Sequence, residues 1–456
     1  MPSPNGSYAA VPPANGMPVN GMPMQSVNGM QGVNGMPRAV PHDSRDLHEM
    51  FLFVNPKSGG NKGEVFLTAP KPFVCEIDGG KKVQVHIHSM LEGDSGNKPG
   101  FHKLREAVAR RGVIRAVVGG GDGTVMWADA EAQKHGINTP TQVIWGIVPL
   151  GTGNDFSRVA GWGGNNPEGV DENDFELLRS LVRQWCAAKV RHHDVWEVTI
   201  KLDHSDGKLF KIGNGKVEED MKLFSKTFKM VNYFSIGQES QVGMHFDKHR
   251  TKSQTCNLFV YGAAGLVQEM RCWGVQHIGN IVANLYNGTS KDGTLIMDSE
   301  GDAGEPQLIG NPESLMFLNI QSYAGGKAHL WQLECGAGVD PAPEGQNVDS
   351  EQDPGDGRLE VVTLPLIANI ALDKLVHEAR KVYSGGPYFL EYFRGEDDVH
   401  AYFEVDGEFY HALNPESTSI TLFKKLQVLQ RVPTGETSDE EWFDLPGFDI
   451  PDEWGC

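Results

Sequence analysis

The sequence predicts an α/β fold: a three-layer domain with a mostly parallel sheet and glycine-rich βα turns, followed by a mostly β, sandwich-like accessory domain. Three apolar runs, at residues 50–54, 114–118 and 143–148, each lead into a turn that contains glycine. Such runs are typical of strands that are buried on both faces of a parallel sheet. Beyond residue 190, runs such as residues 194–200 and 401–405 are β-branched and aromatic and are separated by Gly, Asp and Asn turns, which predicts a second, β-rich domain.

The composition is that of an ordinary globular chain with a strong acidic excess. The 456 residues are 39% hydrophobic and 22% charged, with a formal net charge of −20. This charge argues against nucleic acid as the main partner, because phosphate backbones bind to basic surfaces. The six cysteines are scattered, with no C-x-x-C pair, so neither a zinc module nor a disulfide framework is predicted.

The sequence shows no sign of membrane insertion or secretion. No stretch approaches the roughly 18 apolar residues of a membrane-spanning helix. The N-terminus lacks both the basic start and the apolar core of a signal peptide. We therefore expect a cytoplasmic protein.

The central motif of the chain lies at residues 119–124, Gly-Gly-Gly-Asp-Gly-Thr, between a predicted strand and a predicted helix. Glycines leave no Cβ to keep a phosphate from the backbone, so the N–H groups can hold it at the positive end of the following helix. Asp122 is the only charged residue among these glycines. The alternative is an ordinary glycine-rich turn with a solvated aspartate, since short glycine motifs recur by chance.

Two further glycine turns follow the strands at residues 50–54 and 143–148. In a parallel sheet the three turns lie along the same carboxyl edge, where open α/β sheets bind their ligands. None of them matches the phosphate-binding motif G-x-x-x-x-G-K-[ST]. The turns supply the predicted nucleotide-binding residues: Asn55, Ser58, Gly59, Gly60, Gly119, Gly120, Gly121, Gly123, Thr124, Gly151, Thr152, Gly153, Asn154 and Asp155.

These observations divide the chain into four predicted parts. Residues 1–45 form a low-complexity tail of Pro, Gly, Asn and Met, predicted to be disordered because it buries too little to offset backbone entropy. Residues 46–190 form the nucleotide-binding domain and residues 191–432 the β-rich accessory domain. Residues 433–456 form an acidic tail.

At these intervals the motifs resemble a known family. Asn-Pro-Lys-Ser-Gly-Gly at residues 55–60, the motif at 119–124 and Pro-Leu-Gly-Thr-Gly-Asn-Asp-Phe-Ser-Arg at 149–158 look like the catalytic domain of diacylglycerol kinases. Four later blocks resemble the accessory domain of the same family, and they lie at residues 232–237, 318–326, 356–362 and 405–408. The chain departs from the family at residues 238–240, where Gln-Glu-Ser stands in place of the usual Val-Asp-Ala.

The resemblance implies an ATP-dependent kinase that phosphorylates diacylglycerol to phosphatidic acid in lipid signalling and phospholipid metabolism. The alternatives are a sphingosine or ceramide kinase and a catalytically silent lipid- or nucleotide-binding protein. The substrate implies peripheral contact with a membrane surface. Lysines and an arginine are candidates for a local basic face, with a solvated run of charges as the alternative: Lys222, Lys226, Lys229, Lys248, Arg250 and Lys252.

Phosphoryl transfer needs a held phosphate, Mg²⁺ and a hydroxyl in line with the leaving group. The resemblance implies that Asp122 is essential, and leaves open whether it holds Mg²⁺ or accepts the proton of the lipid hydroxyl. It also implies that the closing strands return toward the cleft, which makes Glu408 a second candidate base, with a glutamate in a hairpin turn as the alternative. Asp356 is a further candidate for Mg²⁺, and a hydrophilic surface turn is its alternative.

Overall fold

The computed structural model describes residues 47–213, 216–220, 224–241, 276–301, 304–323, 328–331, 336–364, 379–395 and 397–432. The predicted tails, residues 1–45 and 433–456, lie outside these ranges. Within them, no helix has the length and apolar character needed to cross a membrane.

The N-terminal half is built on a largely parallel sheet. Its strands are β1 (Leu47–Val54), β2 (Phe73–Glu76), β3 (Lys82–Ser89), β4 (Ile114–Gly120) and β5 (Val143–Pro149), in the spatial order β5-β4-β1-β3-β2. Only β2 is antiparallel to its neighbour. Every residue of β4 except Arg115 is buried, as expected for a strand covered on both faces.

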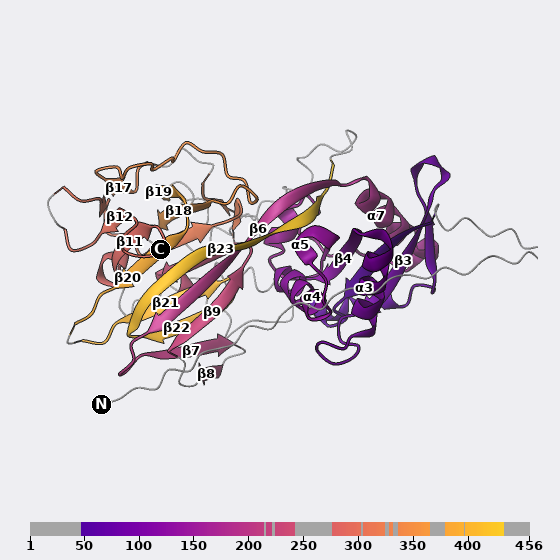
Figure 1. The fold of residues 1–456 in the computed structure, drawn as a ribbon, viewed down its shortest axis with the longest axis horizontal. Coiled ribbons are helices and arrows are strands. Elements are labelled where there is room, and N and C mark those ends of the chain that lie inside the picture. Colours follow the sequence, from indigo (N-terminus) through magenta and orange to yellow (C-terminus); the bar gives the residue numbers. More distant parts are fainter. Residues whose placement is uncertain are drawn as a thin grey trace, which may run out of the picture. The chain divides into compact units, whose positions relative to one another are not determined.

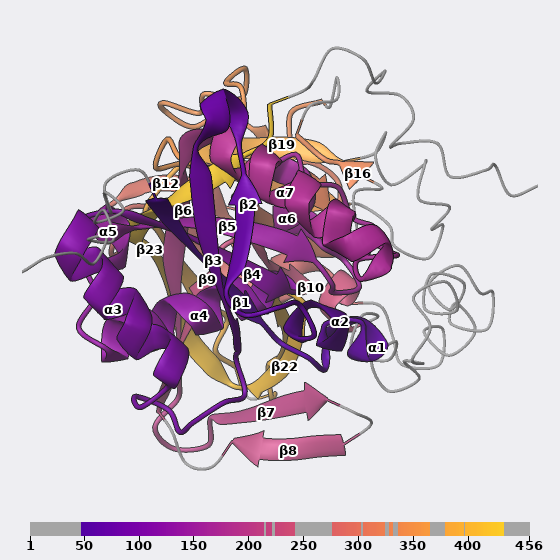
Figure 2. The ribbon, with the colours of Figure 1, turned by 90° about the vertical axis from the view of Figure 1, so that its right-hand side faces the viewer.

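Helices lie on both sides of these strands. The helices are α1 (Ser58–Asn61), α2 (Glu64–Leu67), α3 (Pro99–Arg111), α4 (Asp122–Lys134), α5 (Thr139–Gln142), α6 (Asp155–Val159) and α7 (Glu176–Ala187), with short 3₁₀ turns η1 (Asp78–Gly80) and η2 (Glu172–Phe175). A third 3₁₀ turn, η3 (Ile278–Asn280), precedes β11 in the C-terminal half. Figure 2 shows α3, α4 and α5 on one side of the strands and α6 and α7 on the other. In α3, residues Phe101, Leu104 and Val108 are buried, the spacing of a helix with one apolar face.

The C-terminal half consists mainly of antiparallel strands. They are β6 (Lys189–Leu202), β7 (Lys208–Gly213), β8 (Lys216–Asp220), β9 (Ser225–Met230), β10 (Tyr233–Gly237), β11 (Val282–Asn287), β12 (Thr294–Asp298), β13 (Gln307–Leu308), β14 (Ser314–Leu318), β15 (Ser322–Tyr323), β16 (Ala328–His329), β17 (Val339–Asp340), β18 (Leu359–Leu364), β19 (Arg380–Gly385), β20 (Tyr388–Tyr392), β21 (His400–Val405), β22 (Glu408–Leu413) and β23 (Pro415–Gln430). One sheet has the order β19-β18-β14-β10-β21-β22-β7-β8. Its inner side chains, such as Phe234 and Phe403, share one core with Trp196 and Leu390 of the other large sheet.

The last strand joins the two halves of the fold. β23 pairs with β6 along nearly its whole length, and at Gln427 and Val428 it pairs in parallel with β5. The sheet that begins in the N-terminal half therefore continues through β23 into β20, β11 and β12, and Figure 1 shows β6 and β23 crossing between the halves together. The predicted combination of a parallel α/β region with a strand-rich region is confirmed, and the predicted boundary at residues 190 and 191 falls at the start of β6.

The core of the C-terminal half contains a buried acid, Glu360, which is only 1% exposed. Its Oε1 accepts a hydrogen bond from Ser384 at 3.2 Å, while its Oε2 has no partner. Burial, with a smaller contribution from Asp356, raises the pKa of Glu360 from its ordinary value of 4.5 to about 8. The folded protein therefore holds a proton that the unfolded chain releases near pH 4.5.

Because of Glu360, we expect the stability of the protein to fall as the pH rises. Because the folded-state pKa exceeds the unfolded one, the contribution of Glu360 is fully present below about pH 4.5 and is lost as the pH rises toward 8. Glu360→Gln should remove this dependence and raise the free energy of unfolding at pH 8 by on the order of a few kcal/mol. Urea denaturation at pH 5 and pH 8 measures it, and an equal pH dependence in both proteins would contradict the assignment.

Candidate active site

The turns after β1, β4 and β5 lie side by side at one edge of the sheet. The strand register places Val54 beside Gly119, and Gly120 beside Pro149. Backbone hydrogen bonds continue past the strand ends, from Asn55 N–H to the Gly119 carbonyl at 2.9 Å and from Leu150 N–H to the Gly120 carbonyl at 3.0 Å. The three turns therefore form one continuous backbone surface.

Two contacts between these turns leave no room for a side chain. A Cβ on Gly151 would lie 2.6 Å from the Cα of Gly121, so these two turns approach each other through their backbones. Gly59 has a φ of +62°, and its Cβ would lie 2.9 Å from the carbonyl oxygen of Leu150. A left-handed backbone costs other residues roughly 1–2 kcal/mol, so glycine is required at position 59 for both reasons.

The turns form one wall of a cleft of about 1580 Å³, and the C-terminal half supplies the other. From the N-terminal half the cleft is lined by Lys57, Ser58, Gly59, Gly60, Asn61, Lys62, Gly121, Asp122, Gly123, Thr124, Trp127, Leu150, Gly151, Thr152, Gly153, Asn154, Asp155, Asn165, Asn166 and Glu168. From the C-terminal half it is lined by Asn232, Tyr233, Asp406, Gly407 and Glu408.

Most of the predicted site residues line this cleft, but four do not. Gly119 and Gly120 are paired with β5 inside the sheet. Asn55 accepts the N–H of Lys57 at 3.2 Å with its side chain and so shapes the first turn. Asp356 accepts the N–H of Arg358 at 2.9 Å in a turn before β18, and its predicted role as a magnesium ligand stays a prediction.

Asp122, the first residue of α4, joins three segments of the chain. Its Oδ2 accepts the backbone N–H groups of Asp155 at 2.9 Å and Phe156 at 3.3 Å, and the side-chain N–H of Asn232 at 2.9 Å. Its Oδ1 is buried and has no hydrogen-bond partner in the part of the chain that the structure describes. Burial, with the nearby charge of Asp155, raises the pKa of Asp122 to about 7. A carboxyl with this pKa is suited to exchange a proton near neutral pH.

Two of the residues around Asp122, namely Asn232 and Asp406, were not among the predicted site residues. Asp406 has a left-handed backbone, with φ of 47°, and accepts the N–H groups of Val231, Asn232 and Tyr233 at 2.8, 2.8 and 3.1 Å. It thereby fixes the turn that presents Asn232 to Asp122. Burial raises the pKa of Asp406 to about 6 although these three hydrogen bonds oppose the shift.

The signal for these residues was present in the sequence, because both belong to blocks that resemble the accessory domain. Asn232 begins the block at residues 232–237, and Asp406 lies two positions before Glu408 in the last block. The contact of Asn232 with Asp122 needs the folded chain, since 110 positions separate the two residues.

Glu408, the second predicted base, lies at the mouth of the cleft and is exposed. Its Oε2 accepts hydrogen bonds from the Tyr410 hydroxyl at 2.7 Å and from Lys211 at 3.0 Å. Burial acts to raise the pKa of Glu408, but these two partners outweigh it and lower the pKa below its ordinary value. Glu408 is therefore a weaker base than Asp122 in this arrangement.

Lysines of the first turn bring positive charge to the cleft. Lys57 and Lys62 both line it and are exposed, and Lys62 forms an ion pair of 3.1 Å with Glu168. Neither was among the predicted nucleotide-binding residues, although Lys57 is part of the first motif. Ammonium groups beside the glycine turns can neutralise phosphate charge.

Glu239, where the chain departs from the family pattern, lies in a polar cluster of its own. It accepts hydrogen bonds from Ser235 at 2.6 Å, from Ser240 at 3.3 Å and from the Tyr323 hydroxyl. Burial, together with the charge of Glu239, raises the pKa of Glu404 well above its ordinary range. Glu404 therefore holds its proton, and the two side chains form a hydrogen-bonded carboxyl pair.

The oxygens near Asp122 are compatible with a magnesium ion. Among the described residues, no group of three or more His, Cys, Asp or Glu side chains could hold a metal ion. Mg²⁺ at phosphate sites, however, is usually held by one or two protein oxygens and completed by water and phosphate oxygens. Asp122 Oδ1 and Asn232 Oδ1 are buried and have no hydrogen-bond partner among the described residues, so both could serve as such oxygens.

The strand ends of a parallel sheet form a cleft with glycine walls, and an unpaired carboxylate oxygen lies in it. These features define the class of α/β proteins that bind nucleotide phosphates. Comparison with protein families narrows this class. The diacylglycerol kinase catalytic domain matches residues 49–190, and the diacylglycerol kinase accessory domain matches residues 229–409. The chain belongs to the diacylglycerol kinase family.

Relatives from animals and plants carry the same designation. The chain is 28% identical over 339 residues to the eye-specific diacylglycerol kinase of Drosophila melanogaster, which covers 72% of this chain and 19% of that protein. It is 28% identical over 327 residues to diacylglycerol kinase theta of Mus musculus, covering 70% and 28% of the two chains. Diacylglycerol kinase 4 of Arabidopsis thaliana is 25% identical over 390 residues, covering 79% and 76%. The chain thus spans under a third of the animal relatives' length and about three quarters of the plant relative's.

Proposed function

We propose that this protein transfers the γ-phosphate of ATP to the free hydroxyl of diacylglycerol and so produces phosphatidic acid. The observation that carries the proposal is the cleft itself. The three glycine turns and Asp122 line one wall of it, and Asp406 and Glu408 line the other. Both domain matches of the diacylglycerol kinase family cover these residues. The named relatives are themselves diacylglycerol kinases.

The donor side of this mechanism belongs to the N-terminal half. Backbone N–H groups of the glycine turns bind phosphate oxygens, because no Cβ prevents a close approach. Lys57 and Lys62 supply positive charge beside them. Bound Mg²⁺ would add charge neutralisation for the transferred phosphate, and Asp122 Oδ1 with Asn232 Oδ1 are the oxygens that we assign to it.

The acceptor side belongs to the C-terminal half, because in-line transfer requires the attacking hydroxyl opposite the leaving group. Asp406 and Glu408 line this side of the cleft. Between the two predicted bases, the pKa values favour Asp122, whose carboxyl titrates near 7, over Glu408, which stays ionised through its pairing with Lys211. Asp122 can act as base or as magnesium ligand, and both roles need its negative charge.

A membrane lipid as acceptor requires the protein to work at a membrane surface, so we propose peripheral membrane association. Of the residues predicted to form a basic face, only Lys226 and Lys229 are among those described, and both lie on β9. They are three positions apart and so point to opposite faces of the strand. Lys229 is paired with Glu197 and its ammonium lies 3.2 Å from the ring centroid of Phe423, which is exposed.

Radiolabelled phosphate transfer from ATP to a panel of lipids tests the proposal. We expect diacylglycerol to be phosphorylated faster than ceramide or sphingosine, with Mg²⁺ required. Presenting diacylglycerol in vesicles with and without anionic lipid tests the membrane contact, which should be favoured by anionic lipid at low salt. Faster labelling of ceramide or sphingosine would assign the protein to those kinases, and no transfer to any lipid would support a silent binding protein.

A further inference from the structure

One aromatic side chain in the cleft has no part in the mechanism above. Trp127 lies on α4 and is partly exposed where it lines the cleft. Gly123 and Thr124, in the first turn of the same helix, line it too. At a rise of about 1.5 Å per residue, Trp127 is about 6 Å further along the helix than Gly123. A ligand whose phosphates lie at the first turn therefore has Trp127 within reach.

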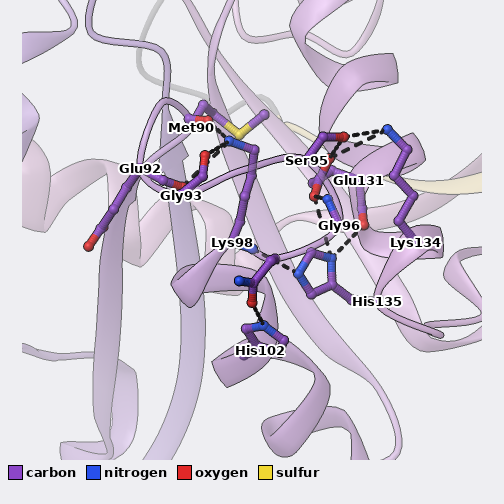
Figure 3. A network of polar contacts seen from close by, with 11 residues as sticks. Met90, Glu92, Gly93, Ser95, Gly96, Lys98, His102, Glu131, Lys134 and His135 are labelled. Carbon is purple, nitrogen blue, oxygen red and sulfur yellow. Dashed lines mark hydrogen bonds and ion pairs between the residues drawn. The ribbon is translucent and has the colours of Figure 1, made fainter.

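A buried ammonium group covers one side of this ring. The Nζ of Lys98 lies 5.7 Å from the centroid of the Trp127 ring. Lys98 is only 6% exposed, and its Nζ donates to the backbone carbonyls of Met90 at 2.8 Å and Gly93 at 3.0 Å. Met90 and Gly93 lie in the loop between β3 and α3. Figure 3 shows the Lys98 side chain reaching back to them. Among the described residues, carbonyl oxygens hold the ammonium and no carboxylate pairs with it, so its charge is available to attract the electron-rich face of the indole.

The loop that holds Lys98 is itself fixed to α4. The carboxylate of Glu131, which is fully buried, accepts the N–H of Gly96 at 2.6 Å and the hydroxyl of Ser95 at 3.2 Å. His135 accepts the backbone N–H of Lys98 at 3.1 Å. Figure 3 shows these side chains converging from α4 on the loop. The ammonium over the ring therefore belongs to a loop that is itself hydrogen-bonded to Glu131 and His135.

Lys98 does not line the cleft, whereas Trp127 does. The tryptophan side chain therefore reaches the cleft, while the ammonium that lies over its ring does not line it. Because Trp127 packs against the hydrophobic core of the N-terminal half, binding against its ring costs little additional side-chain entropy. Such a preordered aromatic surface suits a flat partner, since every nucleobase has a π-face that stacks on tryptophan.

We propose that Trp127 is the platform on which the nucleobase of the phosphate donor stacks, and that Lys98 positions it. The inference rests on the proposed function, because it takes the donor to be ATP. The base is covalently linked to the phosphates, which places it on the donor side of the cleft with Gly123 and Thr124. The acceptor approaches from the opposite side, where Asp406 and Glu408 lie. A large aromatic surface favours a purine through contact area and does not select between adenine and guanine.

Two ligands that share their phosphates and differ in the base test this assignment. Binding of Mg²⁺-ATP and of Mg²⁺-tripolyphosphate to the full chain is measured by calorimetry, without lipid. Trp127→Ala should weaken ATP binding about 5- to 100-fold, the range expected for one base stacked on an aromatic ring, and should leave tripolyphosphate binding unchanged. Trp127→Phe should retain most of the ATP affinity. Phe224→Ala, which removes an exposed ring outside the cleft, should bind both ligands as the wild type does.

Each other outcome overturns the assignment. Equal loss of both ligands in Trp127→Ala would mean that the ring supports the phosphate-binding turns. Unchanged ATP binding, with a raised KM for diacylglycerol, would make Trp127 an acceptor contact. If the wild-type protein bound neither ATP nor tripolyphosphate, the proposed function itself would fail. That failure is distinguishable from failure of the Trp127 assignment, because it is seen in the wild-type protein alone.

Discussion

Asp122→Asn is expected to lower the rate of phosphate transfer about 10²- to 10⁴-fold while leaving the fold intact. The exchange removes the negative charge that either role of Asp122 requires. The asparagine keeps a side-chain oxygen that can accept the N–H groups of Asp155 and Phe156. In the wild-type protein these N–H groups bond to Asp122 Oδ2. Asparagine is also nearly isosteric with aspartate, so the turn needs no rearrangement. The rate with saturating ATP and diacylglycerol, together with the thermal midpoint, measures both parts of the expectation.

A matched control separates this loss from a general effect of removing a carboxylate. Asp206→Asn makes the same exchange in an exposed turn after β6 and should leave the rate unchanged. Glu408→Gln tests the other predicted base. If folded Asp122→Asn retained wild-type turnover while Glu408→Gln lost it, Glu408 would take the catalytic role and Asp122 would be left with the structural one of joining α6 to the turn at Asn232.

Gly151→Ala is expected to destabilise the protein by about 1–3 kcal/mol, the usual range for an added methyl group that the surroundings cannot accommodate. The new Cβ would lie 2.6 Å from the Cα of Gly121 and 2.8 Å from the Asn154 side chain. Neither neighbour can move freely, because Gly121 leads directly into α4 and the amide of Asn154 bonds to Gly151 and Gly164. Separating the two turns should also abolish most activity.

Gly123→Ala provides the comparison for this prediction. Gly123 is the second residue of α4, and a Cβ there meets no atom within 4 Å. Alanine favours helix over glycine by roughly 1 kcal/mol, so stability should be kept or raised, while the methyl group at the cleft wall should weaken ATP binding. Urea denaturation and calorimetry measure the two effects. Equal stability of Gly151→Ala and Gly123→Ala would contradict the close approach of the two turns.

The contrast between these two glycines shows where sequence reasoning ends. A glycine-rich turn after a buried strand predicts that backbone will approach backbone or ligand, and the prediction is the same for every glycine of the motif at residues 119–124. Which glycine is indispensable depends on a neighbour from another turn. Gly151 meets Gly121 across the site, whereas Gly123 adopts ordinary helical backbone and meets nothing.

The strands of the parallel sheet and the turns that follow them were determined by the sequence itself, because both depend on local features. Strands β1, β4 and β5 each contain a short apolar run. β1 ends before Asn-Pro, β4 continues through two glycines of its motif, and β5 ends two residues before Gly151. The spacing of apolar residues and the turn preferences of Gly, Asn and Pro act over a few residues, and they do not depend on the rest of the fold. The candidate donor side of the site, with Asp122 at the start of α4, was therefore predictable.

The rest of the site was decided by the tertiary structure. Asp122, Asn232 and Asp406 meet only because β10 pairs with β21 and because β23, from the end of the chain, pairs with both β6 and β5. These pairings bury apolar faces that lie up to hundreds of residues apart, and no local pattern states which faces will meet. The same holds for Lys98, whose burial beside Trp127 follows from the packing of its loop on α4.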